Sequence, residues 1–194
     1  MPKYAYRLTG LKDISRRLKT LSKEASDAVD EELTAGAFRM EGIAKRLAPV
    51  DEGLLRNSIG VDKSKRFQKE FFANAFYAAY REFGTGKKVH IPSGYEKMAA
   101  EAKSLPKRGN AQQFFYKLVQ WVHRKGISGT YSVKTQRRTG NRKTQAEQDY
   151  AVAYLIMREI LRNGSKPTPF MIPAYEQVKN TIPEKIIKRI KKLT

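Results

Sequence analysis

Residues 44–61 read AKRLAPVDEGLLRNSIGV, and this stretch decides the fold. From Leu11 to Leu47 the apolar residues recur with a period of about 3.6, which predicts one amphipathic helix or two consecutive helices. Pro49 ends that pattern, because the residue before a proline is pushed out of the helical region. Gly53 follows, and a glycine adopts the backbone angles that a tight turn requires. The stretch therefore predicts an abrupt stop between a long helix and the chain after it.

Beyond the stop, a rough alternation of apolar and polar residues is typical of strands. Residues 55–65 are predicted to form one strand and residues 67–75 a second, joined as a hairpin across DKSKRFQ. The aromatic-rich segment FYAAYREFGTGKK follows and is predicted to be a short turn of helix or an edge segment that ends in a loop.

The middle of the chain is predicted to hold three helices, in SGYEKMAAEAKSL, AQQFFYKLVQWVHRKG and AEQDYAVAYLIMREILRNG. The last two end alike, with basic residues in the final turn and a glycine after it, which is typical of a helix C-terminus. Between them lies SVKTQRRTGNRKTQ, which has five basic residues and no acidic ones. We interpret this segment as an exposed, mobile loop or hairpin tip.

The C-terminal part of the chain begins with three closely spaced prolines. Pro167, Pro169 and Pro173 are predicted to force an extended entry, and a final helix is predicted to start near Pro173 or Ala174, where proline is tolerated in the first turn. Pro183 is expected to break or kink that helix. We expect PTPFMIPA to pack against the sheet as an extended segment with a buried Phe170.

Charge is the most pronounced global property, with a net value of +20. Residues 1–60 hold 11 basic and 9 acidic residues, whereas residues 61–194 hold 28 and 10. Such a surface attracts polyanions, with nucleic acid as the default partner, or it keeps the protein soluble. The chain has no Cys, which excludes disulfides, thiolate metal sites and Cys nucleophiles. MPKYAYRLTG lacks the apolar core of a signal peptide, and the run AVAYLIM is too short to span a bilayer.

A search for catalytic chemistry finds no constellation. The two histidines, His90 and His123, are too few for a zinc site, and EFGTGKKV fails as a phosphate loop. A metal-dependent nuclease would need clustered carboxylates, and those beyond residue 60 are scattered. Asp51 is interpreted as a turn former, Glu52 as solvated, and Glu82 as the partner of a nearby Lys or Arg. No catalytic, cofactor-binding or metal-binding residues are predicted.

Three motifs in order carry a family resemblance: AKRLAPVDEGLLRNSI, FYAAYREFGTG and PTPFMIPAYEQV. Together they resemble the tail-completion or head–tail joining (neck) family of long-tailed bacteriophages. The first motif is matched by Ala44, Ala48, Pro49, Asp51, Gly53, Leu55, Arg56 and Ser58, the second by Tyr77, Ala78, Glu82, Phe83, Gly84 and Thr85, and the third by Pro169, Phe170, Pro173 and Ala174. Glu52 departs from the family's Thr, and the roughly 80 residues between the second and third motifs exceed the minimal family pattern.

The resemblance implies an α+β fold, with a long N-terminal helix packed on a small antiparallel sheet, a helical insertion and a C-terminal helix. It implies a non-enzymatic virion protein at the head–tail connector or tail-completion position, assembled in the bacterial cytoplasm, with no cofactor. The implied partners are other copies in a homo-oligomeric ring, portal and head–tail adaptor proteins, and tail-tube or tail-terminator proteins. In this reading the motif residues serve structure and assembly.

The resemblance divides the chain into a core of residues 1–86 with 165–194 and a mainly helical insertion, residues 87–164. The alternative function is non-specific nucleic-acid binding by the basic insertion and the C-terminal helix. In either case the basic loop is a candidate for contact with DNA or an acidic partner, through Lys134, Arg137, Arg138, Arg142 and Lys143.

Overall fold

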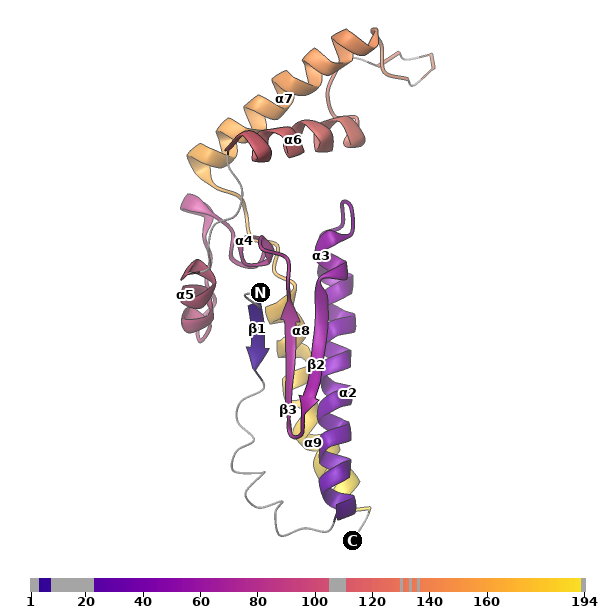
Figure 1. Ribbon diagram of the computed structural model, residues 1–194, viewed down its shortest axis with the longest axis vertical. Coiled ribbons are helices and arrows are strands. Elements are labelled where there is room, and N and C mark those ends of the chain that lie inside the picture. Colours follow the sequence, from indigo (N-terminus) through magenta and orange to yellow (C-terminus); the bar gives the residue numbers. More distant parts are fainter. Residues whose placement is uncertain are drawn as a thin grey trace. The chain divides into compact units, whose positions relative to one another are not determined.

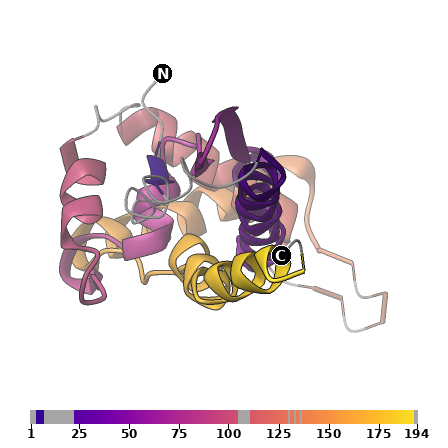
Figure 2. The same ribbon diagram turned by 90° about the horizontal axis from the view of Figure 1, so that it is seen from below.

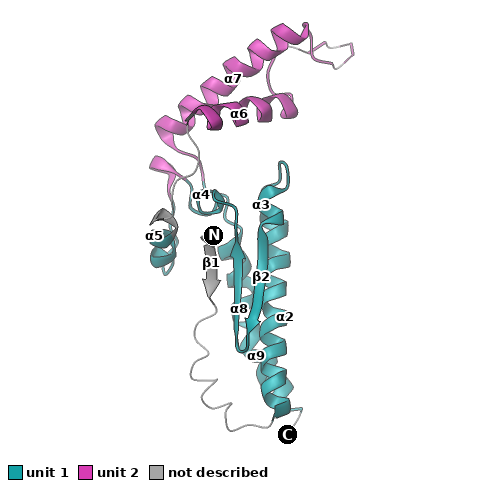
Figure 3. Cartoon of the chain, in the orientation of Figure 1, with its two compact units in different colours: residues 1–84, 90–105, 167–194 teal, residues 85–89, 106–166 magenta. Residues whose placement is uncertain are grey.

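The computed structural model describes residues 4–7, 23–104, 111–129, 131–132, 134–135 and 137–192. Residues 11–22 of the predicted helix lie outside this part of the chain. The chain forms two compact units, coloured separately in Figure 3. Unit 1 comprises residues 1–84, 90–105 and 167–194, and unit 2 comprises residues 85–89 and 106–166. The division into a core domain, residues 1–86 with 165–194, and an insertion, residues 87–164, stays a prediction from the sequence.

Unit 1 combines a small antiparallel sheet with helices, so the predicted α+β fold is confirmed (Figure 1). Its described elements are β1 (Tyr4–Arg7), α2 (Lys23–Leu47), α3 (Leu54–Asn57), β2 (Ile59–Lys65), β3 (Gln68–Ala73), α4 (Ala78–Phe83), α5 (Glu96–Ser104), α8 (Met171–Lys179) and α9 (Thr181–Ile190). The strand predicted at residues 55–65 is shorter than expected, because its first residues form α3. β1 was not predicted at all.

The sheet has the strand order β1-β3-β2, with both neighbouring pairs antiparallel. Along β3 the side chains of Lys69, Phe71 and Ala73 are buried, while those between them are half-buried. This period of two places one face of the sheet against helix α2. The turn between β2 and β3 contains Phe67 at φ 59, and the Phe67 N–H donates to Asp30 of α2 at 2.7 Å. Asp30 also pairs with Lys69 at 2.8 Å, so α2 fixes the tip of the β2–β3 hairpin.

Helix α2 supplies the centre of the core. Its buried stripe is apolar and includes Val29, Leu33, Met40 and Ala44, which recur at helical spacing as predicted. Figures 1 and 2 show α9 running beside α2, and both α8 and α9 contact it. At Gly36 a Cβ would lie 2.5 Å from Ile182 Cδ1, so the glycine permits this close approach.

The C-terminal segment forms two helices rather than the single helix that the sequence predicted. Helix α8 begins at Met171, two residues before Pro173, and Asn180 separates it from α9. Pro173 and Pro183 therefore each lie in the first turn of a helix, where no intrahelical N–H is lost. Only residues 167–170 of PTPFMIPA lie outside a helix, which corrects the expectation that the whole segment is extended.

Unit 2 contains η1 (Gly86–Lys88), α6 (Ala111–Lys125) and α7 (Arg142–Asn163). The three helices predicted in the middle of the chain are present as α5, α6 and α7, and α7 begins four residues earlier than predicted. Helices α6 and α7 pack on each other, and Val122 and Ala153 are fully buried. The rings of Phe115 and Tyr150 meet edge to face at 5.6 Å. Among the described helices, none is long and apolar enough to cross a membrane.

Candidate functional site

The first motif builds the turn from α2 into the sheet. Gly53 has φ 78, a left-handed conformation that favours glycine, as the sequence predicted. Leu55 is buried, and Arg56 Nε donates to the Lys45 carbonyl at 3.0 Å, which ties α3 to the end of α2. Ser58 Oγ donates to the Leu55 carbonyl at 2.7 Å. These residues fix the direction in which β2 leaves the turn.

The second motif meets both of the others. Burial raises the pKa of Tyr77, which lies close to Arg81, Asp51, Glu52 and the backbone of Leu55, so the first and second motifs adjoin here. Glu82 then joins the second motif to the third. Its buried carboxylate accepts three N–H groups at the start of α8, from Phe170 at 2.9 Å, Met171 at 3.0 Å and Ile172 at 2.8 Å.

Glu82 was predicted to pair with a cation, and this prediction is wrong. The first N–H groups of a helix have no intrahelical partner, and a carboxylate is well suited to accept them and to face the positive end of the helix dipole. Burial raises the pKa of Glu82, and the three N–H donors act in the opposite direction. Phe170 and Ala174 are fully buried beside this junction, whereas Pro169 is exposed. The motifs therefore assemble the core of unit 1.

Thr85, the final residue of the second motif, closes the base of unit 2. Its N–H donates to the Ser165 carbonyl at 3.0 Å, and its Oγ1 accepts the Ser165 N–H at 2.8 Å. Gly164 has φ 77, and a side chain there would collide with the Thr85 carbonyl. The two ends of the segment between these residues are thus held together.

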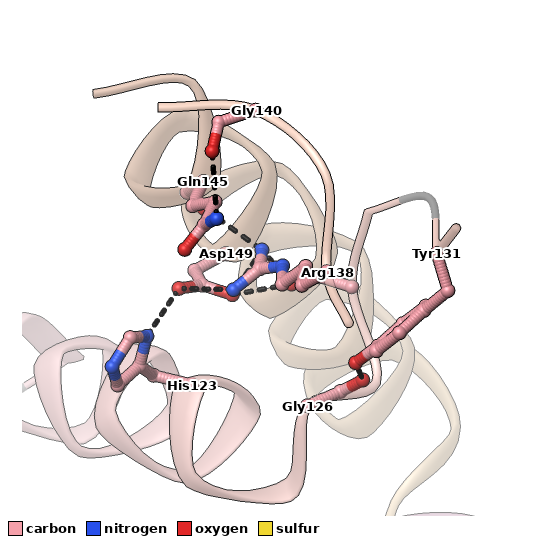
Figure 4. Close-up of polar contacts among 8 residues, drawn as sticks. His123, Gly126, Tyr131, Arg138, Gly140, Gln145 and Asp149 are labelled. Carbon is pink, nitrogen blue, oxygen red and sulfur yellow. Dashed lines mark hydrogen bonds and ion pairs between the residues drawn. The ribbon is translucent and has the colours of Figure 1, made fainter. Parts of the chain in front are cut away.

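A polar cluster lies where α6, the following loop and α7 meet (Figure 4). Asp149 of α7 is buried and pairs with Arg138 Nη2 at 2.8 Å. The same carboxylate accepts from Ser128 and lies 2.9 Å from His123 Nδ1. Burial acts to raise the pKa of Asp149, but the hydrogen bonds from Arg138, Ser128 and His123 outweigh it and hold the pKa below its usual range.

The cluster corrects the interpretation of the basic loop. Arg138 was expected to lack a neutralising carboxylate, yet its side chain is only 11% exposed and binds Asp149. Tyr131 and Arg138 form a β-bridge, and the Tyr131 hydroxyl donates to the Gly126 carbonyl. The other four predicted contact residues, Lys134, Arg137, Arg142 and Lys143, are exposed. The loop is therefore a hairpin fixed by one of its five basic residues.

Ser128, His123 and Asp149 do not have the arrangement of a catalytic triad. In a triad the histidine lies between the nucleophile and the acid, whereas here Ser128 and His123 each bind Asp149 directly. Within the described residues, no group of three or more His, Asp or Glu side chains is placed to bind a metal. The cluster is thus a means of holding the hairpin.

The turn after α2 also exposes apolar side chains. Leu47 is 44% exposed, Val50 53% and Leu54 55%, and all three belong to residues 47–54, the stop segment between α2 and α3. Large exposed apolar groups are common at surfaces that contact other proteins. No feature of the sequence pattern distinguished these side chains from the core residues beside them.

Comparison with known families gives one match. Residues 12–84 match the family described as "Bacteriophage HK97-gp10, putative tail-component", so the predicted resemblance to a phage tail-completion family is confirmed for this segment. The match covers α2, the stop, the β-hairpin and α4, and it spans less than half of the chain. It supports a structural protein of a bacteriophage virion. No curated protein and no solved structure matches the chain.

Proposed function

We propose that the protein is a non-enzymatic structural component at the head–tail connector (neck) or tail-completion position of a tailed bacteriophage. The observation that carries the proposal is the match of residues 12–84 to a family of phage tail components. The structure is compatible with it, because the matched segment and the third motif form one core, joined through Glu82. On this proposal the motif residues create a rigid unit rather than a reaction centre.

The protein would act by self-association into a ring and by docking to portal, adaptor or tail proteins. A closed ring needs two different, complementary surfaces on each subunit. The stop segment, with Leu47, Val50 and Leu54 exposed, supports one such surface, because burying these side chains against a neighbour is favourable. The β2 edge of the sheet is a second candidate, since its outer backbone groups face no further strand in the described sheet.

The size of the purified protein in solution tests the proposal. Light scattering at about 0.1 M and about 1 M salt should report an oligomer that survives the higher salt, because apolar contacts are not screened. Leu54→Asp should dissociate it. The matched control is Leu161→Asp, since Leu161 is 67% exposed but lies on α7 in unit 2.

A monomer at every salt and protein concentration, together with absence of the chain from purified virions, would contradict the proposal. A monomer that binds DNA with a steep dependence on salt would favour the alternative function, non-specific nucleic-acid binding. Dissociation by Leu161→Asp and not by Leu54→Asp would move the docking surface from the stop segment to unit 2.

A further inference from the structure

Unit 2 carries most of the excess positive charge. Residues 85–89 and 106–166 contain 15 basic and three acidic residues, whereas the rest of the chain contains 24 and 16. Of the three acidic residues, Asp149 is buried against Arg138, and Glu159 lies 3.7 Å from Lys88 near the other end of α7. The hairpin and the first turn of α7 carry five of the 15 basic residues and none of the three acidic ones.

Asp149 of α7 holds the basic hairpin, which is closed by the β-bridge between Tyr131 and Arg138. Arg138 reaches back from the hairpin to this carboxylate and donates also to the Gln145 carbonyl at 2.9 Å. The Ser132 N–H donates to the Arg137 carbonyl at 2.9 Å, which closes the hairpin below Lys134. Figures 1 and 2 both show it extending beyond the N-terminal end of α7. Arg138 is thus used for an internal ion pair, and this ion pair holds the hairpin that carries the exposed basic residues.

Four basic residues gather on this support. Lys134 and Arg137 belong to the hairpin, and Arg142 and Lys143 occupy the first turn of α7. None of the four has an ion pair within the described residues. Cations in the first turn of a helix face the positive end of its dipole, so stability alone would favour acidic side chains there. The arrangement costs free energy in the isolated protein, and an external anion would recover it.

The composition of the hairpin indicates which anion. Residues 134–143, the hairpin tip and the first turn of α7, read KTQRRTGNRK and contain no apolar side chain, and the exposed Tyr131 at the base of the hairpin is bound through its hydroxyl to Gly126. Protein–protein interfaces depend on buried aromatic or aliphatic anchors, whereas interfaces with nucleic acid are polar and strongly positive. We propose that this basic hairpin binds the phosphates of double-stranded DNA without sequence preference, and that Asp149 is the positioning residue that holds it. The proposal does not depend on the position of the protein in a virion.

Two variants of equal net charge test the surface. One replaces Lys134, Arg137, Arg142 and Lys143 with Gln; the control replaces four exposed lysines of unit 1 outside the C-terminal helix, Lys23, Lys63, Lys65 and Lys97, with Gln. Affinity for a labelled duplex is measured against salt concentration by fluorescence anisotropy. Each lost phosphate contact should flatten the slope of log K against log salt by about 0.9, so the hairpin variant should lose about 3 to 4 units and the control little.

Asp149→Asn separates position from charge. It raises the net charge, yet it releases Arg138 and the hairpin, so DNA affinity should fall severalfold rather than rise. Tyr131→Phe leaves the charge unchanged and removes only the hydroxyl bond to Gly126, so a smaller fall is expected. Circular dichroism establishes that each variant is folded, and if Asp149→Asn is not, Tyr131→Phe decides the positioning role.

Equal slopes for the hairpin variant and the unit 1 control would overturn the proposal, because the attraction would then be a property of overall charge. Retained DNA affinity in the hairpin variant, with loss of particle assembly, would also overturn it and indicate an acidic protein partner. Higher DNA affinity in Asp149→Asn would refute the positioning role.

Discussion

The two units of this chain are stabilised in different ways. Unit 1 has a continuous apolar core, formed by α2, the inner face of the sheet, α8 and α9, and its 24 basic residues are balanced by 16 acidic ones. Unit 2 has few fully buried side chains among its described residues, and two of them, Ser128 and Asp149, are polar. The apolar core stabilises unit 1. In unit 2 the buried carboxylate of Asp149 instead holds a hairpin in place.

Most of the buried apolar side chains thus lie in unit 1, whereas the larger excess of basic over acidic residues lies in unit 2. Hydrophobic burial scales with apolar area, so unit 1 should dominate the free energy of unfolding. Unit 2 has 15 basic and three acidic residues and little core, so substitutions there should change binding more than stability.

Phe170→Ala should produce the largest loss. Phe170 is fully buried in the core of unit 1, and truncation of such a side chain leaves a cavity that costs about 3–5 kcal/mol of unfolding free energy. Urea denaturation measures the change. Phe114→Ala, at a side chain that is 37% exposed in unit 2, is the control and should cost much less. Equal losses would show that the two units contribute alike to stability.

Glu82→Gln should follow. The amide keeps the shape of the side chain but removes the charge that accepts three backbone N–H groups, and hydrogen bonds to charged groups contribute about 1.5–3 kcal/mol. Thermal and urea unfolding measure the loss, with Glu147→Gln on exposed α7 as control. Wild-type stability in Glu82→Gln would mean that the neutral side chain caps α8 equally well.

Gly53→Val should cost less, about 1–2 kcal/mol, because a side chain disfavours the left-handed conformation at φ 78. The matched control is Gly42→Ala within α2. A Cβ at Gly42 meets only Arg46 Nη1 at 3.9 Å, so this change should add about 0.5–1 kcal/mol. If Gly53→Val melts normally but fails to assemble, Gly53 belongs to an interface.

The smallest effect concerns the pH dependence of the hairpin. The pKa of Asp149 is lowered in the folded protein, so its stabilising contribution is complete above the usual Asp value of 3.8 and is lost as the pH falls below it. NMR signals of residues 126–149 should therefore change between about pH 5 and about pH 2, at a lower pH than the signals around Glu82, whose pKa burial raises. In Asp149→Asn this transition should be absent. A simultaneous change in both units would contradict the local origin.

The parts of the fold that were predicted correctly have local signals. Pro49 and Gly53 mark the end of α2, and the period-two pattern marks the β-hairpin, because each depends on neighbouring residues alone. Helix α3 was missed because four residues are too few to show a helical period. Strand β1 was missed because its pairing with β3 joins residues far apart in sequence.

The site was less predictable for the same reason. The donors to Glu82 lie 88 to 90 residues away, and no local pattern announces a carboxylate that caps a remote helix. In a chain of net charge +20 a cation seemed the natural partner, but backbone N–H groups satisfy the carboxylate instead. The pairing of Arg138 with Asp149 was likewise hidden, because the loop and α7 were interpreted as separate segments.

The remote cap of α8 also sets an order of events during protein synthesis. Glu82 leaves the ribosome 88 residues before its first donor, Phe170, and at about 5–20 residues per second the wait is about 4 to 18 s. Throughout that interval the whole of unit 2 is made, and its base can close through Thr85 and Ser165 before α8 exists. The side of α2 that α8 and α9 will cover stays open to water or to a chaperone for the same time. Helices α8 and α9, which are synthesised last, thus complete the packing around α2, which is synthesised early.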